Sequence, residues 1–191
     1  MYPGAQGGKA IAEILFGEVS PSGKLPVTFY RDLEGMPEFT DYSMKNRTYR
    51  YMEKEALYPF GYGLTYGDAS VTDFVIKNEV SKESDIEVEV TVKNEGSVCT
   101  DEVVQVYIKD LESPLAVRNY SLCAFKRVHL AAGETVTVPM TIRNAAMNVI
   151  DEQGERHIDS SRFALYAGVS QPDARSEKLT GHAAVKVEFT V

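Results

Sequence analysis

Closely spaced carboxylates are the residues of this chain that could carry out hydrolysis. One carboxylic acid can protonate a leaving group while a second acts as nucleophile or base. The chain offers many such pairs, among them Glu53 and Glu55, Glu87 and Glu89, and Asp101 and Glu102. Glu87 and Glu89 alternate with valines, so we interpret them as the solvated face of a strand. Because the other pairs are equally unremarkable, the sequence predicts no catalytic residue within the chain.

Neither the histidines nor the glycines of the chain indicate a functional site more strongly than the carboxylates do. The three histidines are isolated from one another: His129, His157 and His182. The chain contains no H-E-x-x-H, G-x-S-x-G or P-loop pattern. Gly61 and Gly63 are not framed by a strand and a helix, as a nucleotide-binding loop requires. The sequence therefore predicts no metal site and no cofactor.

Three side chains in the segment NRTYRY could bind a ligand: Arg47, Tyr49 and Arg50. An arginine can hydrogen-bond a sugar or a carboxylate, and a tyrosine can stack on a sugar face. The alternative, which we favour, is that these cationic and aromatic groups stitch two domains together. Glycines near residues 4–8 could present N–H groups to an anion, but a tight entry into a helix is the simpler interpretation.

Composition excludes several classes of function. The chain has 191 residues, a net charge of −8 and a pI near 5.0, which argues against a phosphate-binding surface. No apolar stretch is long enough to span a bilayer, and residues 1–20 show no signal-peptide pattern. Cys99 and Cys123 are interpreted as small buried or half-buried thiols, with a disulfide as the alternative. They favour a reducing, cytoplasmic compartment, and secretion stays open.

The first thirty residues predict one helix and one strand. Ala10, Ile11, Ile14 and Leu15 recur at helical spacing within residues 7–16, and Gly17 can end the helix. After a turn signal, LPVTFY (residues 25–30) is typical of a short strand. A single helix and strand bury little surface together. We therefore interpret residues 1–30 as the C-terminal remnant of a larger α/β domain.

Residues 31–69 lack periodicity but are rich in aromatic residues. The segment YPFGYGLTY (residues 58–66) contains four aromatics, two glycines and a proline. A loop this long is uncommon in a compact domain unless it is functional or a linker, and it is too aromatic for disorder. We predict a tether whose rings are ordered by packing against neighbouring structural units.

From residue 70 onward, polar and apolar residues alternate as in short β-strands. The predicted strands are residues 85–93, 103–108, 122–130, 135–142, 147–150, 163–169 and 184–191. Their regular spacing predicts an antiparallel β-sandwich over residues 70–191. The absence of Trp and the closeness of the two cysteines favour a fibronectin type III-like sandwich over an immunoglobulin domain. The predicted fold class is mainly β.

Five motifs, in order, resemble the C-terminal end of a family-3 glycoside hydrolase of the β-glucosidase and β-xylosidase type. They are YPGAQGG (2–8), AIAEILFG (10–17), PSGKLPVTF (21–29), NRTYRY (46–51) and YPFGYGLTY (58–66). VKNEGSVCTDEVVQVYI (92–108), FKRVHLAAGE (125–134) and FALYAGVSQPD (163–173) are similar to the family's fibronectin type III-like domain. The resemblance covers essentially the whole chain.

The resemblance implies a parent enzyme that hydrolyses terminal β-linked sugars with retention. In the family, the nucleophile lies in a barrel and the acid/base in the α/β domain, and neither carboxylate can be carried onto this sequence. A Trp often precedes the YPG motif; Met1 stands there, as expected at a cut. The fragment itself is expected to be an inactive, stabilising module, with Arg47, Tyr49 and Arg50 near the parent's cleft.

The expected partners are the remainder of the parent enzyme and, for the parent, a β-linked glycoside, with no nucleic acid and no membrane. The apolar helix at Ala10–Phe16 could also pair with a second copy. The rival hypothesis is a stand-alone carbohydrate- or protein-binding sandwich. Such a module usually presents a planar row of aromatics, whereas Tyr107, Phe125, Phe163 and Tyr166 are expected in the core.

Overall fold

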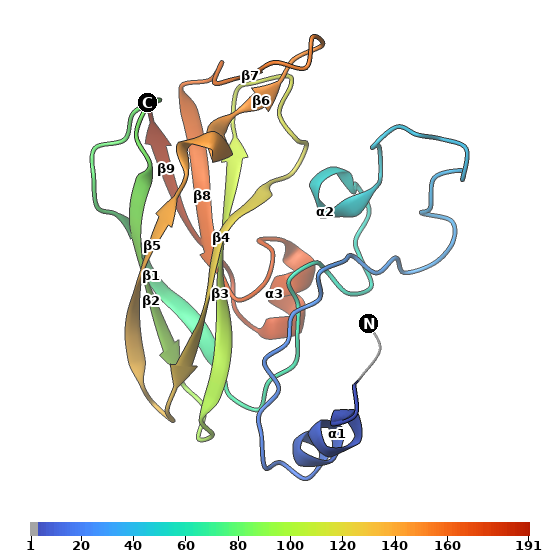
Figure 1. Cartoon of the computed structure of the whole chain (residues 1–191), viewed down its shortest axis with the longest axis vertical. Coiled ribbons are helices and arrows are strands. Elements are labelled where there is room, and N and C mark those ends of the chain that lie inside the picture. The colour runs from blue at the N-terminus through green and yellow to red at the C-terminus, as the bar shows by residue number, and fades with distance from the viewer. Residues whose placement is uncertain (1–3) are drawn as a thin grey trace.

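Two antiparallel sheets packed face to face form the body of the computed structural model, which describes residues 4–191 (Figure 1). One sheet has the strand order β1-β2-β5 and the other β4-β3-β8-β9, with a small β6-β7 ribbon at one end. The strands are β1 (Ala69–Ile76), β2 (Ile86–Asn94), β3 (Thr100–Asp110), β4 (Ser121–Leu130), β5 (Thr135–Ile142), β6 (Val149–Ile150), β7 (Arg156–His157), β8 (Arg162–Gly168) and β9 (Val185–Thr190). The helices are α1 (Gly7–Leu15), α2 (Thr48–Tyr51), the 3₁₀ helix η1 (Asn144–Met147) and α3 (Ala174–Thr180).

The inward-facing side chains of β2 form the centre of the core. Ile86, Val88, Val90 and Val92 are buried, while the residues between them face outward. β2 pairs with β5 so that Val90 lies opposite Val138. Successive side chains of a strand point to opposite faces, so one face is buried against the second sheet. The predicted mainly β, antiparallel sandwich is confirmed, and β1 adds a strand that was not named from the sequence.

β3 is buried on both faces, unlike β2. Val104, Val106 and Ile108 point into the core between the sheets. Gln105 and Tyr107 are equally buried but face the opposite way, where the chain preceding the sandwich covers the sheet. Tyr107 is therefore buried as expected, but beneath the covering segment rather than between the sheets.

Phe125 contradicts the expectation that the strand aromatics belong to the core. Its side chain is 68% exposed on β4, whereas Phe163 is fully buried. Phe125 lies opposite Gln105 in the β3–β4 pairing, so it shares the outer face of the sheet. The tether covers Gln105 but leaves Phe125 in solvent, because β4 is the edge strand.

The predicted strand at residues 25–30 is wrong. The segment is extended, but only an isolated bridge between Phe29 and Tyr58 has strand character. Leu25 N donates to Tyr62 O at 2.9 Å, and Gly61 N donates to Leu25 O at 2.8 Å. Because proline has no N–H, Pro26 and Pro59 prevent a continuous ladder along this pairing. The segment joins the end of the tether instead of a sheet.

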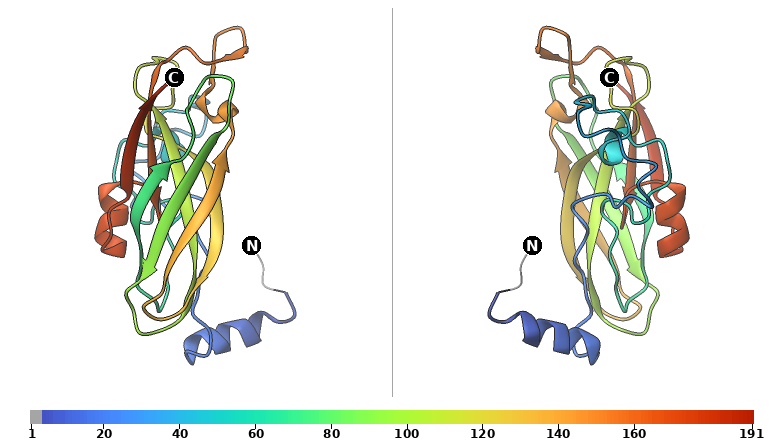
Figure 2. Two further views of the ribbon diagram at one scale, coloured as in Figure 1. Left: turned by 90° about the vertical axis from the view of Figure 1, so that its left-hand side faces the viewer. Right: turned by 90° about the vertical axis from the view of Figure 1, so that its right-hand side faces the viewer.

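Helix α1 stands away from the sheets beyond one end of the sandwich (Figure 2). None of its residues is buried, and Leu15 and the following Phe16 are 75% and 83% exposed. Its attachment includes a hydrogen bond from the Tyr66 hydroxyl to Ile14 O at 2.7 Å. The expectation of an exposed apolar face is confirmed for Ile11 and Leu15, while Ile14 is half-buried. Met1 and the first two residues of the YPGAQGG motif lie outside the described residues.

Helix α3 was missed by sequence analysis although its boundary signals are present. The Asp173 side chain caps the helix by accepting a hydrogen bond from Ser176 N at 2.6 Å. Gly181 ends it with φ +79°, a left-handed conformation that glycine adopts readily. A cap residue before the helix and a glycine after it are recognised signals in sequence. The helix has only seven residues, which is too short for a helical spacing of apolar residues to be recognised in the sequence.

Candidate functional site

The tether (residues 31–69) lies across the outer face of the four-stranded sheet, and aromatic rings hold it there (Figure 2). Tyr49 of α2 stacks on Phe60, with ring centroids 4.2 Å apart and an interplanar angle of 13°. Both rings meet the edge of Tyr107 at 6.0 and 6.5 Å. The Tyr49 hydroxyl accepts a hydrogen bond from Leu122 N at 2.9 Å. The structure therefore has the aromatic stitching that the sequence favoured.

A buried amide fixes the end of the tether. Gln105 Nε2 donates to Gly61 O and to Val169 O, both at 3.0 Å. Gln105 Oε1 accepts from the Tyr107 hydroxyl at 2.7 Å. Gly61 has φ +77°, and a Cβ there would lie 2.2 Å from Gln105 Oε1. Glycine is thus required both by the backbone angle and by the close approach to the sheet.

The one nearly buried carboxylate among the three candidate pairs is Glu102, and it is tied to a lysine. Lys24 Nζ lies 2.6 Å from Glu102 Oε1, and the two side chains are 11% and 2% exposed. The same oxygen accepts from Val103 N at 2.6 Å. A buried carboxylate that is occupied by a cation and by an N–H donor suits a structural anchor between segments better than a catalytic group. Its neighbour Asp101 contacts Arg127 at 2.5 Å on the surface.

The pair Glu53 and Glu55 is occupied by surface cations. Glu55 lies between Arg31 at 2.6 Å and Lys178 at 3.3 Å. The hydrogen bond from Lys178, aided by the nearby cations, lowers the pKa of Glu55 below its ordinary value. A general acid needs the opposite shift. Glu53 pairs with Arg118 at 3.5 Å.

Glu87 and Glu89 lie on the outer face of β2, as predicted. Glu87 accepts from the Thr141 hydroxyl at 3.1 Å, and Glu89 pairs with Lys77 at 2.9 Å. These contacts join neighbouring strands across an exposed sheet face. Within residues 4–191, therefore, none of the three carboxylate pairs has the arrangement of an acid and a nucleophile around a cleft.

The three residues proposed for ligand binding divide into two groups. Arg47 donates to Ser43 O at 3.1 Å, Glu38 O at 3.2 Å and Asp41 O at 2.5 Å, so it closes the loop that precedes α2. Tyr49 is buried in the aromatic cluster. Arg50 is exposed and lies over the Tyr49 ring at 5.9 Å from its centroid. The structure brings Tyr49 and Arg50 together and directs Arg47 to the backbone.

The backbone around Arg47 is unusual. Asn46 and Thr48 have φ angles of +57° and +53°. Left-handed angles are tolerated by asparagine but are rare for a β-branched residue such as threonine. Strained residues persist where surrounding contacts over-determine them, and the three hydrogen bonds of Arg47 supply such contacts.

The histidines and cysteines are dispersed. His129 contacts Asp101 at 2.7 Å and His182 contacts Asp68 at 2.6 Å, at separate places on the surface. In the part of the chain that the structure describes, no group of three or more His, Cys, Asp or Glu side chains could hold a metal ion. Cys99 and Cys123 are both free thiols, so the alternative of a disulfide between them is not realised.

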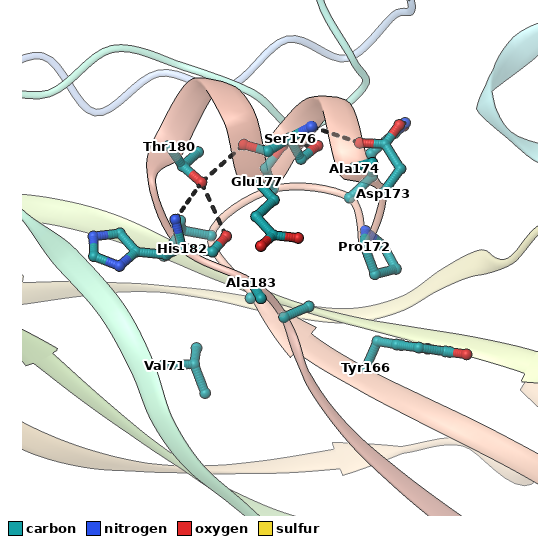
Figure 3. A pocket seen from close by; sticks show the side chains of 15 residues that line it. Val71, Tyr166, Pro172, Asp173, Ala174, Ser176, Glu177, Thr180, His182 and Ala183 are labelled. Carbon is teal, nitrogen blue, oxygen red and sulfur yellow. Dashed lines mark hydrogen bonds between the residues drawn. The ribbon is translucent and has the colours of Figure 1, made fainter. Parts of the chain in front are cut away.

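A pocket of about 220 Å³ lies beneath α3, between the helix and the sheet. Figure 3 shows Tyr166 and Val71 on the sheet side and Glu177 projecting from the helix toward Ala183. The Thr180 hydroxyl donates to Ser176 O at 2.9 Å and accepts from His182 N at 3.2 Å. These bonds belong to the last turn of α3 and to the chain that leaves it. The pocket therefore contains no paired acid and base.

Within residues 4–191, no helix is both long and apolar enough to cross a membrane.

Comparison with protein-family models gives two matches. Residues 1–66 match the C-terminal domain of glycosyl hydrolase family 3, and residues 102–171 match a fibronectin type III-like domain. The first match contains α1, α2 and the tether almost to its end. The second contains β3 to β8 of the sandwich. The two matches occur in the order expected from the resemblance in sequence.

Curated relatives extend the match over nearly the whole chain. A xylan 1,4-β-xylosidase of Xylanibacter ruminicola is 37% identical over 188 residues, covering 94% of this chain and 21% of the relative. The thermostable β-glucosidase B of Acetivibrio thermocellus is 34% identical over 209 residues, covering 100% of this chain and 28% of the relative. The chain thus spans about a fifth to a quarter of the length of these relatives.

Solved structures of β-glucosidases share the fold of this chain over nearly its whole length. A β-glucosidase from Erythrobacter marinus superimposes with a TM-score of 0.80 at 30% identity, covering 100% of this chain and 24% of that one. The β-glucosidase from Kluyveromyces marxianus gives a TM-score of 0.78 at 28% identity, covering 96% and 22%. The likeness includes the segments before the sandwich as well as the sandwich itself. The chain belongs to glycosyl hydrolase family 3 and corresponds to the C-terminal region of its members, with their fibronectin type III-like domain.

Proposed function

We propose that this chain is the C-terminal part of a retaining β-glycosidase and that it braces the enzyme without supplying either catalytic carboxylate. The parent hydrolyses terminal β-linked sugars. One observation carries the proposal: the chain matches both family models in order, yet its closely spaced carboxylates are tied to cations or neighbouring strands. Residues 1–30 close the α/β domain, residues 31–69 form the tether, and residues 70–191 form the sandwich.

The distribution of exposed apolar side chains supports a brace. The sandwich core is closed, whereas large apolar side chains of residues 4–66 face solvent. The most exposed are Leu15, Phe16, Leu33, Phe39, Tyr42 and Leu64. Exposed apolar patches of this kind mark interaction surfaces. Since these residues lie within the region matched by the family's C-terminal domain, we assign this surface to the remainder of the parent enzyme.

A substrate-binding role for Arg47, Tyr49 and Arg50 belongs to the same proposal. Arg50 is the exposed member, so it is the one able to reach a sugar in the parent's cleft. Arg47 and Tyr49 then act by holding the loop and helix that present it.

An activity assay tests the assignment of the chemistry. The 191-residue chain should not hydrolyse nitrophenyl β-glucoside or nitrophenyl β-xyloside. Turnover that disappears on Glu102→Gln, or on changing any other carboxylate of this chain, would place the catalytic groups here and refute the proposal.

Complementation tests the brace itself. A truncated form of the Xylanibacter xylosidase, lacking the residues that correspond to this chain, should be unstable or inactive. Adding the chain should raise its melting temperature or recover turnover of nitrophenyl β-xyloside. The control is the same chain with Leu15→Glu and Phe16→Glu, which places charge on the docking surface. Equal rescue by both chains would argue against docking through this surface.

Pairing with a second copy is a separate proposal that rests on the exposed face of α1 at residues 10–16. Light scattering of the chain should then report a dimer that the double variant converts to a monomer. A single monomeric species at all concentrations would remove the proposal.

The rival function, a polysaccharide-binding module, is addressed by Phe125, which is exposed on the sheet. One exposed ring does not form the planar row that such modules use. The chain should therefore flow through a column of insoluble glucan, and retention would favour the rival.

A further inference from the structure

A closed loop, residues 31–46, projects from the tether away from both sheets (Figure 1). Its two ends are joined, because the Tyr30 hydroxyl donates to Asn46 O at 2.6 Å. Arg31, at the start of the loop, pairs with Glu55 at 2.6 Å. Compact loops whose ends meet are frequently functional. The closed loop therefore has a defined place and defined ends, unlike a slack linker.

Hydrogen bonds inside the closed loop hold its shape. The Arg47 guanidinium donates to Glu38 O, Asp41 O and Ser43 O, which come from three positions of the loop. Ser43 N also donates to the Asp41 carboxylate at 2.8 Å. A loop that is already held in one conformation can bind a partner without the cost of ordering it.

Large apolar side chains face outward from this fixed backbone. Leu33, Phe39 and Tyr42 are 82%, 93% and 92% exposed, and Met36 and Met44 are 51% and 46% exposed. The polar backbone groups of the loop are thus engaged inside, while its apolar groups are left in solvent. Exposed apolar surface of this kind marks a protein interface.

The closed loop carries more carboxylates than cations. Its cations are Arg31 and Lys45, and its carboxylates are those of Asp32, Glu34, Glu38 and Asp41. Arg31 is engaged by Glu55, while Lys54, from the next part of the tether, lies beside Gly35. Carboxylates still outnumber the remaining cations, Lys45 and Lys54. A complementary partner has an apolar surface edged by lysine or arginine.

The closed loop and α1 lie on the same side of the molecule (Figure 1). Both belong to residues 1–66, which match the C-terminal domain of the family. The chain spans 21% of the xylosidase relative, so the parent offers a large further surface. A partner that covers α1 on this side can also reach the loop, which favours the remainder of the parent over a second copy.

We propose that the closed loop is a second docking point of the chain, separate from α1. It inserts Phe39 and Tyr42 into an apolar recess with a basic edge on the remainder of the parent enzyme. This inference rests on the brace function proposed above and names the contact that carries it. Arg47 shapes the loop from inside and makes no contact with the partner.

Hydroxyl-radical footprinting tests the contact, because it reports the solvent exposure of side chains. The isolated chain is compared with a fusion in which it replaces the corresponding region of the Xylanibacter xylosidase. Oxidation of Phe39 and Tyr42 should be lost in the fusion. Phe125, exposed on the sandwich, should stay reactive in both proteins. Buried Phe163 should stay unreactive in both, which shows that the sandwich is folded.

Equal oxidation of Phe39 and Tyr42 in the two proteins would overturn the proposal. Protection that appears in the isolated chain and grows with its concentration would assign the loop to a second copy, and would overturn it too. A fusion that is active but leaves the loop exposed refutes the docking point and keeps the brace. A fusion that protects the loop but is inactive keeps the docking point and counts against the brace.

Substitutions separate docking from folding. Phe39→Ser combined with Tyr42→Ser should lower the melting temperature of the fusion and leave that of the isolated chain unchanged, because both side chains are exposed there. Phe125→Ser, at another exposed aromatic residue, is the matched control and should shift both proteins equally. Equal shifts of the two proteins by the double variant would contradict docking through these rings.

Two further variants test the shape and the charge of the loop. Arg47→Met removes the donor that holds the loop closed and should restore oxidation of Phe39 in the fusion, whereas Lys45→Met should not. Glu34→Lys combined with Glu38→Lys should also restore oxidation, because like charges then meet at a basic edge. Full protection of Phe39 in both the Arg47 variant and the double lysine variant would overturn the proposed fit.

Discussion

At the residue scale, the polar groups that attracted attention in the sequence serve attachment. Glu102 belongs to a candidate catalytic pair, yet it anchors Lys24 from the segment before the tether. Arg47 was a candidate ligand-binding residue, yet its guanidinium is occupied by three backbone carbonyls. Residue type alone cannot distinguish these roles, because the partner that neutralises each charge is distant in sequence.

The Lys24–Glu102 pair should be essential to stability. Lys24→Met leaves Glu102 buried without its cation, and removing one partner of a buried pair destabilises by about 3–5 kcal/mol. Urea unfolding measures the effect. Lys93→Met breaks an exposed pair with Glu95 at 2.8 Å and should change stability by less than about 1 kcal/mol. Equal effects of the two substitutions would contradict the anchoring role of Lys24.

The two thiols should differ in reactivity. Burial raises the pKa of Cys123 to about 12, and its Sγ donates to Val106 O at 3.2 Å. Because the thiolate is the reactive form, Cys123 should resist iodoacetamide at pH 8 while exposed Cys99 is alkylated. Mass spectrometry of the folded chain should find one modification, and none in Cys99→Ser. Rapid labelling of Cys123 would show that the strand opens readily.

At the element scale, the end of the tether is fitted to β3 through a glycine. Gly61→Ala introduces a Cβ that would lie 2.2 Å from Gln105 Oε1 and 2.7 Å from the Tyr107 hydroxyl. Gly133→Ala is a matched control, since Gly133 has φ +73° and no atom within 4 Å of the added Cβ. Both substitutions carry the penalty of a left-handed residue.

Gly61→Ala should therefore be more destabilising than Gly133→Ala by about 1–3 kcal/mol, the usual effect of overpacking. The midpoints of denaturant unfolding give the difference. If the two variants lose the same stability, the close approach of the tether to β3 does not contribute.

Helix α1 should be the least protected element of the chain. It has nine residues and none is buried, and helices this short are marginal in water without packing. Hydrogen exchange should find its amides nearly unprotected, whereas those of β2 exchange only through global opening. Protection of Ile11, Ile14 and Leu15 that depends on protein concentration would instead support pairing of α1 between copies.

At the scale of the whole molecule, the boundary of the folded unit lies before the sandwich. Lys24 and Ser20 contact β3 residues, since the Ser20 hydroxyl lies 2.7 Å from Thr100 Oγ1. The C-terminal α3 also reaches back, with Lys178 near Glu55 and Arg175 on Leu57 O. Tether and sandwich therefore form one unit, to which α1 is loosely attached.

A truncation series tests this division. A chain beginning at Glu18 loses α1 and should melt within about 2 °C of the full chain, because no buried residue is removed. A chain beginning at Arg31 also loses Lys24 and with it about 3–5 kcal/mol, so it should melt about 6–20 °C lower if 1 kcal/mol shifts the midpoint by about 2–4 °C. Equal melting temperatures of the two truncated chains would show that residues 18–30 add nothing to the unit.

The sequence by itself determined the sandwich and the family. The alternation of Ile86, Val88, Val90 and Val92 reports a strand with one buried face, because the side-chain period of a strand is two. The ordered motifs indicated a family that the comparisons confirm. These signals are local, so they can be read without knowing what each segment contacts.

The tertiary structure decided which faces are covered and which polar groups are paired. It buried Tyr107 on the outer face of β3, exposed Phe125 on the edge strand, and joined residues 25–29 to the tether instead of a sheet. It also brought segments about 50 to 120 residues apart in sequence together around one pocket of about 340 Å³. Burial of a second face and pairing of a charge depend on distant segments, and no local pattern records them.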